Sequence, residues 1–178
     1  MNIFIREEKV KDYNIVESII EKAFVEAEHS DNNEHKLVSK LRESHAFVQD
    51  LSLVAEIEGE IKGHILMTKA LIENGEDSFE TLVLAPLSVL PEYQKKGIGS
   101  KLIKEAFERA KKLGYTSVIV LGHKNYYPKF GFEKASKYSI EAPFSVPEEC
   151  FMIAKLQDNA LHGVNGVVIY AKEFFNLQ

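Results

Sequence analysis

The sequence has few cysteines, no long apolar run and fewer basic than acidic residues, and each of these shortages excludes a class of protein. Its 178 residues include a single cysteine, Cys150, so an intramolecular disulfide is excluded. No apolar run approaches the roughly 18 residues of a membrane-spanning helix, and residues 1–6 lack the basic-then-apolar order of a secretory signal. We therefore expect a cytoplasmic protein that does not enter a membrane.

Positive charge is also in short supply. Asp and Glu number 27 against 22 for Lys and Arg, which gives a net charge of −5. Nucleic-acid backbones are held mainly by dense cationic surface, so this balance argues against a nucleic-acid partner. No repeat or linker divides the chain, and an apolar content of 45% suffices for a buried core. We expect one domain over residues 1–178.

The most informative stretch joins an apolar strand to an amphipathic helix. Residues 82–87, LVLAPL, predict a buried strand. Apolar residues then recur at three- and four-residue steps, which predicts a helix with one buried face. These residues are Ile98, Leu102, Ile103, Ala106, Phe107, Ala110 and Leu113. The free N–H groups in the first turn of such a helix bind phosphate, and Gly97 and Gly99 let a ligand approach the main chain. We expect a diphosphate at this junction.

Spacing separates three kinds of phosphate loop. A Walker loop needs Gly-Lys-Ser/Thr, whereas Gly99 is followed by Ser-Lys, the reverse order. A dinucleotide fingerprint needs a third glycine where Leu102 stands, and an acidic residue on the next strand, where residues 116–121 have none. The remaining pattern is Gln-x-x-Gly-x-Gly, which begins at Gln94.

The segment after the helix completes a strand, helix, strand unit. Gly114 suits the C-terminal cap of the helix, and residues 117–121 predict a second buried strand. Such a unit predicts a parallel pair of strands with a ligand at their carboxyl ends. Beyond the second strand, Tyr127 precedes a Gly-Phe pair, Gly131 and Phe132, by four residues.

Taken together, these motifs resemble the GNAT superfamily of N-acetyltransferases. That superfamily has the pattern Gln/Arg-x-x-Gly-x-Gly/Ala in its coenzyme A pyrophosphate loop, and a tyrosine four residues before a Gly-Phe pair. Longer strings resemble its bacterial YhbS-like branch, namely residues 51–65, 84–91, 121–132 and 142–147. The resemblance covers nearly the whole chain.

The resemblance implies an α/β fold, the GNAT fold, whose central mixed twisted sheet is splayed between strands 4 and 5 and flanked by helices. Its core would occupy about residues 1–135, and residues 136–178 would add C-terminal strands that complete the sheet and the acceptor side. The first expected elements are a strand at 3–6, a helix capped by Asp12 that carries Ile15, Ile19 and Phe24, and a helix with Leu37, Val38 and Leu41. A hairpin of 51–57 and 61–68 about Glu58-Gly59 follows, and the C-terminal strands are 146–156 and 164–170.

The resemblance also implies the reaction and its co-substrate. An acetyl group passes from acetyl-CoA to a primary amine by direct attack in a ternary complex. Main-chain groups of the fourth strand would pair with the pantetheine arm, and Pro86 supports this because proline sits at strand edges and bulges. The expected coenzyme-binding residues are Leu87, Ser88, Val89, Gln94, Lys95, Lys96, Gly97, Ile98, Gly99, Ser100 and Asn125.

Tyr127 is the expected general acid, which protonates the departing sulfur; the alternative is a tyrosine packed in the pocket wall. Asn125 suits a hydrogen bond to the coenzyme and equally a turn. The base stays open between a water chain and two carboxylates, Glu80 and Glu34. His64 lies mid-strand among apolar residues and suits a core histidine.

Several alternatives and partners complete the prediction. The histidines are scattered without metal-ligand spacing, so no metal is expected. The acceptor would be a small-molecule or peptide amine, and a homodimer is possible. Other functions for the same fold are a non-catalytic acyl-CoA-binding or partner-binding module, and an acyltransferase with a longer acyl donor.

Overall fold

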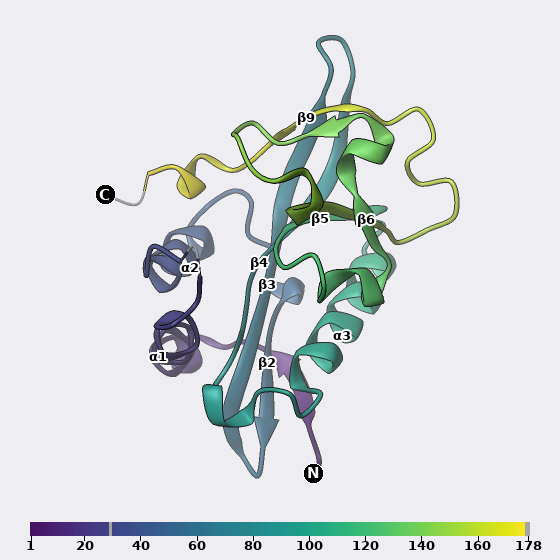
Figure 1. Cartoon of the computed structure of the whole chain (residues 1–178). Helices are drawn as coiled ribbons and strands as arrows, with labels where there is room; N and C mark the ends of the chain where they lie inside the picture. The colour runs from purple at the N-terminus through teal and green to yellow at the C-terminus, as the bar shows by residue number, and fades with distance from the viewer. Residues whose placement is uncertain (29, 177–178) are drawn as a thin grey trace. The chain divides into compact units, whose positions relative to one another are not determined.

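The computed structural model describes residues 1–28 and 30–176 (Figure 1). Its helices and strands are β1 (Phe4–Glu7), α1 (Tyr13–Phe24), α2 (Glu34–Arg42), β2 (Ser52–Ile57), β3 (Glu60–Glu73), β4 (Ser78–Val89), α3 (Ile98–Lys112), β5 (Ser117–Leu121), β6 (Phe132–Lys134), β7 (Ile140–Glu141), β8 (Phe151–Lys155) and β9 (Gly166–Ile169). The chain forms two compact units. The first unit contains residues 1–68, 85–109 and the segment from Lys172 onward, and the second contains residues 69–84 and 110–171.

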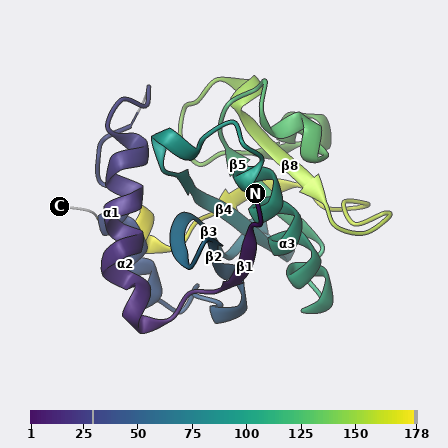
Figure 2. The same cartoon turned by 90° about the horizontal axis from the view of Figure 1, so that it is seen from below.

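The first unit contains the hydrogen-bonded strand order β1, β2, β3, β4. Helices α1 and α2 lie side by side on one face of these strands and α3 lies on the other, as the two views agree (Figures 1 and 2). Each helix buries one stripe, for example Val16, Ile19 and Ile20 of α1. On the opposite face, a Cβ added to Gly63 would lie 3.1 Å from Ile98 Cγ2, so a glycine at this position lets β3 and α3 approach closely.

The second unit contains a mixed set of strands in the order β9, β3, β4, β5, β8, β6. Strands β4 and β5 are parallel, with Leu82 opposite Val118 and Val83 opposite Ile119. Strand β8 is antiparallel to both β5 and β6, and β7 is parallel to β9. The predicted parallel pair, with α3 as its crossover helix, is confirmed.

Most predicted elements are confirmed, with shifted ends. Strand β5 has the predicted bounds, and β2 and β3 form the predicted hairpin. Its turn has positive φ at both Glu58 (53°) and Gly59 (81°), as a tight two-residue hairpin turn requires. The C-terminal strands β8 and β9 are shorter than predicted. The single domain expected over residues 1–178 stays a prediction.

Two details of the predicted helices are wrong, and the predicted N-cap is confirmed in position but not in its hydrogen bond. Ile15 is 48% exposed, because α1 turns Val16 rather than Ile15 toward the core, and Leu113 is 44% exposed, because it lies beyond the last turn of α3. Asp12 occupies the N-cap position of α1 but does not cap it. Its carboxylate instead accepts hydrogen bonds from Arg6 Nη1 at 2.7 Å and from the Lys9 amide at 2.8 Å.

The described residues contain neither a membrane-spanning helix nor a cluster of metal ligands. No helix there has the length and apolar character needed to cross a bilayer. Within residues 1–28 and 30–176, no group of three or more His, Cys, Asp or Glu side chains is arranged to hold a metal ion. One of the histidines considered from the sequence, His29, lies outside the described residues.

Candidate functional site

In the first unit, the loop between β4 and α3 reverses the chain over eight residues. A short 3-10 turn at Pro91–Tyr93 leads into Gln94, whose side-chain amide donates a hydrogen bond to the Val89 carbonyl at 3.1 Å. Lys95 (φ 62°) and Gly97 (φ 86°) both have left-handed backbone conformations. This conformation is uncommon for a residue with a side chain such as Lys95, so the loop holds a specific path rather than a relaxed one.

The start of α3 leaves three amides without an acceptor in the helix. Gly97 is its N-cap residue, because the Lys101 amide donates to the Gly97 carbonyl at 3.1 Å as the first bond of the helix. The amides of Ile98, Gly99 and Ser100 therefore have no acceptor within the helix, and the helix dipole adds positive potential there. A Cβ added to Gly97 would meet no atom within 4 Å, so the space in front of the loop is open. This geometry suits a phosphate group.

Two lysines contact the aromatic ring of Tyr93 beside this loop. Lys62 Nζ lies 4.8 Å from the ring centroid and Lys96 Nζ lies 5.0 Å from it. Cations at this range are attracted to the face of a tyrosine ring. Sequence reasoning identified Lys96 and missed Lys62, because Lys62 lies on β3 and has no motif around it.

Strand β4 presents part of its main chain at an edge. The Leu90 amide donates to the Lys62 carbonyl at 3.0 Å, which in an antiparallel ladder places Val89 opposite Gly63 and Ser88 opposite His64. The main-chain groups of Leu87 and Val89 therefore point away from β3. Among the described residues, pairing of β4 with β5 is limited to Leu82 and Val83. The amides of Leu87 and Val89 are thus placed to pair with an extended ligand.

The β3–β4 hairpin also contains a β-bulge. The Asn74 amide bonds to the Asp77 carbonyl at the turn, and Leu90 bonds to Lys62 at the other end. Twelve positions separate Lys62 from Asn74, but thirteen separate Asp77 from Leu90, so β4 contains one extra residue. Pro86 lies within this span, where a bulge or edge was expected.

In the second unit, Tyr127 is held in a tight aromatic cluster just beyond β5. A Cβ added to Gly122 would lie 2.3 Å from Tyr127 Cε2, so only glycine fits beneath the ring. The rings of Tyr126 and Phe132 pack edge-on against Tyr127 at centroid distances of 5.1 and 5.5 Å. Gly131 has a φ of 94°, which explains the glycine of the Gly-Phe pair, while Phe132 supports the tyrosine.

Burial, with a smaller contribution from Tyr126, raises the pKa of Tyr127 well above its ordinary value. The phenol is therefore protonated at neutral pH and has a proton to donate. Asn125 is exposed on the loop that precedes Tyr127, and the backbone amide of Asn125 donates a hydrogen bond to His123 Nδ1 at 3.1 Å. The structure places Asn125 and Tyr127 in one loop, while the other predicted site residues, from Leu87 to Ser100, lie in the first unit.

The two carboxylates considered as general bases, Glu34 and Glu80, lie on different elements, α2 and β4. Glu34 begins α2, where one carboxylate oxygen accepts the Ser30 hydroxyl at 2.5 Å. Glu80 lies near Ser117 at the amino end of β5, whereas Tyr127 packs on Gly122 past its carboxyl end. Five residues of extended strand separate these ends by about 16 Å, so Glu80 does not lie beside Tyr127.

A buried polar network in the first unit was not found from the sequence. The Glu8 carboxylate accepts hydrogen bonds from Arg42 Nη2 and from the Ser52 hydroxyl, both at 2.6 Å. Because the Ser52 proton points to Glu8, its oxygen accepts from His64 Nε2 at 3.1 Å, which assigns the His64 tautomer. Burial, and then the charge of Arg42, lower the pKa of His64 to about 3, so the imidazole is neutral.

This network ends beside β4. Among the described residues, His64 Nδ1 and Ser88 Oγ are buried and have no hydrogen-bond partner. The two side chains lie opposite one another across the β3–β4 ladder, a separation that one water molecule can bridge. Glu8, Ser52 and His64 are far apart in sequence and form no recognisable spacing, so no sequence signal was available.

Known proteins resemble this chain in sequence and in structure. Residues 48–134 match the family model of the acetyltransferase (GNAT) domain. The uncharacterized N-acetyltransferase YjhQ of Escherichia coli K12 is 42% identical over 129 residues, which cover 70% of this chain and 71% of YjhQ. The uncharacterized N-acetyltransferase YhbS of the same strain is 34% identical over 142 residues, which cover 79% of this chain and 83% of YhbS.

Two solved structures match most of the chain. The crystal structure of E. coli YhbS in complex with CoA matches with a TM-score of 0.85 at 28% identity, over 98% of this chain and 92% of that one. A GNAT family acetyltransferase from Brucella melitensis in complex with acetyl-CoA matches with a TM-score of 0.77 at 30% identity, over 97% and 98% of the two chains.

Proposed function

Since this chain belongs to the GNAT family of acetyltransferases, we propose that it moves an acetyl group from acetyl-CoA to a primary amine by direct attack in a ternary complex. The observation that carries the proposal is the junction of β4 and α3, where three unpaired amides, an open glycine N-cap and nearby lysines occur together. The relatives solved with CoA and acetyl-CoA support the same co-substrate here.

The coenzyme is held mainly by main-chain groups. Its diphosphate accepts hydrogen bonds from the amides between Gly97 and Ser100, with Gln94 fixing the loop and Lys95 and Lys96 supplying positive charge. The pantetheine arm pairs with the main-chain groups of Leu87 and Val89, which point away from β3. Ser88 lies between these two residues, and its main-chain groups face β3. A backbone amide aimed at the thioester oxygen stabilises the developing oxyanion, typically by about 3 kcal/mol in a dry site.

Tyr127 is proposed as the general acid. The neutral amine nitrogen attacks the thioester carbonyl carbon, the carbon–sulfur bond breaks, and the phenol donates its proton to the departing sulfur. The nitrogen then loses a proton to water, and a proton from solvent restores the phenol. A phenol whose pKa is raised by burial holds that proton until charge develops on sulfur. Asn125, exposed on the same loop, is proposed to donate a hydrogen bond to the coenzyme. Neither Glu80 nor Glu34 is assigned as the base.

An assay of thiol release tests the reaction. The protein is incubated with acetyl-CoA and a panel of small amines and peptides, free thiol is followed continuously, and acetylated product is identified by mass. Release that requires both substrates is the expected result. CoA binding without release from any acceptor would instead favour the non-catalytic acyl-CoA-binding module. Comparison of acetyl-CoA with butyryl-CoA distinguishes a short from a longer acyl donor.

The setting of the enzyme is also proposed. We expect a bacterial, cytoplasmic protein that acts on a small-molecule or peptide amine without nucleic acid. Light scattering of the purified chain checks the possible homodimer.

A further inference from the structure

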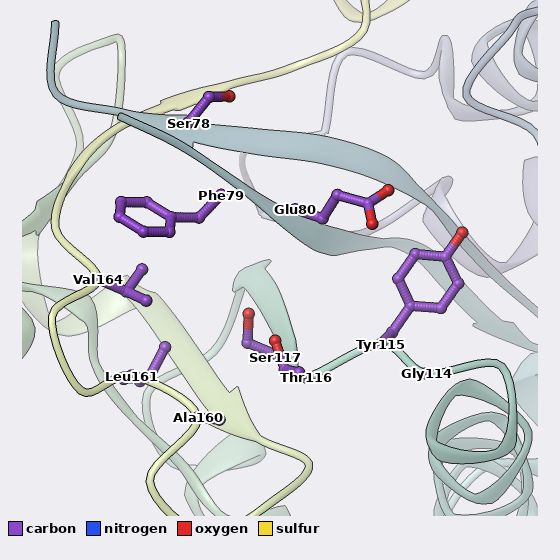
Figure 3. Close-up of a pocket in the computed structure, with 10 residues that line it drawn as sticks. All are labelled: Ser78, Phe79, Glu80, Gly114, Tyr115, Thr116, Ser117, Ala160, Leu161 and Val164. Carbon is purple, nitrogen blue, oxygen red and sulfur yellow. The ribbon is translucent and has the colours of Figure 1, made fainter. Parts of the chain in front are cut away.

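The second unit contains a pocket that the transfer chemistry does not use (Figure 3). Its volume is about 360 Å³, at the lower end of the range for small-molecule sites. The first residues of β4, the start of β5 and a loop near the C-terminal strand line it. These residues are Ser78, Phe79, Glu80, Gly114, Tyr115, Thr116, Ser117, Ala160, Leu161 and Val164.

The pocket has a polar end and an apolar end. The Glu80 carboxylate and the Tyr115 ring lie at one end, whereas Phe79, Leu161 and Val164 lie at the other (Figure 3). Burial and then the nearby Glu80 carboxylate raise the pKa of Tyr115, so this phenol is protonated at neutral pH. Within the described part of the chain, Glu80 has no ion-pair or hydrogen-bond partner, and no Lys, Arg or His lines the pocket.

Hydrogen bonds hold the pocket floor in place. The Thr81 hydroxyl lies 2.7 Å from the Ser117 hydroxyl and 3.2 Å from its carbonyl, which ties the start of β5 to β4. The Leu156 amide donates to the Thr116 carbonyl at 2.8 Å, which ties the segment after β8 to the same place. Since these bonds do not involve Glu80 or Tyr115, the polar end is free to bind a ligand without rearrangement of the walls.

We propose that this pocket is a second small-molecule site, separate from the transfer site, and that it binds an organic cation composed of a primary ammonium group and a compact apolar body. The ammonium donates to the Glu80 carboxylate and to the Tyr115 phenol oxygen, and the apolar body covers Phe79, Leu161 and Val164. The unpaired carboxylate disfavours anions, and the apolar end disfavours fully polar ligands. The site is distinct from Tyr127, because the two lie at opposite ends of β5.

Calorimetry at neutral pH without acetyl-CoA tests the site, with phenethylamine as the probe and 2-phenylethanol as its uncharged counterpart. The amine should bind at least tenfold more tightly than the alcohol. Glu80→Gln should weaken amine binding at least tenfold. Glu76 is exposed like Glu80 but lies in the adjacent turn outside the pocket, so Glu76→Gln should leave amine binding unchanged. Equal binding of amine and alcohol, or no heat from the amine at millimolar concentration, overturns the proposal.

A filling variant separates this site from the acceptor site of the enzyme. Val164→Phe should abolish amine binding to the pocket while acetyl-CoA-dependent thiol release and the melting temperature stay near wild type. Amine binding that survives both Glu80→Gln and Val164→Phe would show that the amine binds outside this pocket and would contradict the proposal. Because the binding measurement needs no turnover, it stands or fails independently of the proposed acetyl transfer.

Discussion

The two compact units position the groups proposed to act in acetyl transfer by different means. The first unit presents main-chain amides, at the start of α3 and along β4, and the conformation of the loop decides where they point. The second unit presents one side chain, Tyr127, whose position depends on the rings and the glycine packed around it. A main-chain site therefore depends on backbone geometry, whereas a side-chain site depends on its packing neighbours.

Burial also acts in opposite directions on the two units' titratable groups. It lowers the pKa of His64 in the first unit to about 3 and raises that of Tyr127 in the second. The cause is the same, because a dry environment disfavours the charged form of either group. Both groups are neutral at pH 7, so the imidazole joins a hydrogen-bond network and the phenol keeps a transferable proton.

The largest effect on CoA affinity is expected for Gly97→Ala, which tests the main-chain amides of the first unit. A Cβ at a φ of 86° strains the loop and projects into the space proposed for the diphosphate, so CoA affinity should fall about 100-fold, or about 2.7 kcal/mol. Gly59→Ala is a matched control, since Gly59 has a φ of 81° and open space but belongs to the β2–β3 turn rather than to the loop. Calorimetry with CoA should show a loss only for Gly97→Ala, and an equal effect of the two would remove the loop from the coenzyme site.

The corresponding test of the side chain in the second unit is Tyr127→Phe. Loss of the phenolic proton should lower kcat by about 100-fold, while CoA affinity changes little because the ring remains. Tyr126→Phe, which alters the neighbouring ring in the same way, should have a small effect. An undiminished kcat in Tyr127→Phe would exclude Tyr127 as the acid.

A smaller effect should follow from Gly122→Ala, which disturbs only the support of Tyr127. The new methyl group collides with the ring, so the protein should lose about 1–3 kcal/mol of stability and part of its kcat. In a Tyr127→Ala background the collision is gone, and the same change should cost far less stability. Urea unfolding of the four proteins measures this coupling, and equal costs in both backgrounds would contradict the contact.

An effect confined to acidic pH concerns the stability of the buried network. The pKa of His64 is near 6.5 unfolded and about 3 folded, so the stability that its neutral form contributes is complete above pH 6.5 and is lost as pH falls toward 3. Between pH 7 and pH 5 this loss is about 2 kcal/mol for a fully buried group facing Glu8 and Arg42. His64→Gln should remove that slope in urea unfolding, whereas His123→Gln, at an exposed site, should keep it.

The local parts of the fold could be predicted because their signals are local. The apolar period of α3, the glycine turn between β2 and β3 and the strand β5 each occupy a short stretch of chain. Details that depend on which helix face meets the sheet were wrong, as at Ile15, because a helix pattern one residue out of phase looks nearly the same in sequence. Asp12 has the predicted N-cap position, but its carboxylate binds Arg6, six residues earlier, instead of an amide of the helix.

The amino-acid sequence by itself determined the strand, loop and helix from Leu82 to Lys112, and the place of Tyr127 before its Gly-Phe pair. Only the tertiary structure decided that Gly122 lies beneath Tyr127, that Lys62 joins Lys96 at Tyr93, and that His64 meets Ser52 and Glu8. It also decided that Glu80 lines a pocket with Tyr115 rather than lying beside Tyr127. The physical reason is the distance along the chain over which each effect acts. Backbone propensity and glycine conformation act within a few residues, whereas packing and buried hydrogen bonds join side chains that are far apart in the sequence and form no recognisable pattern in it.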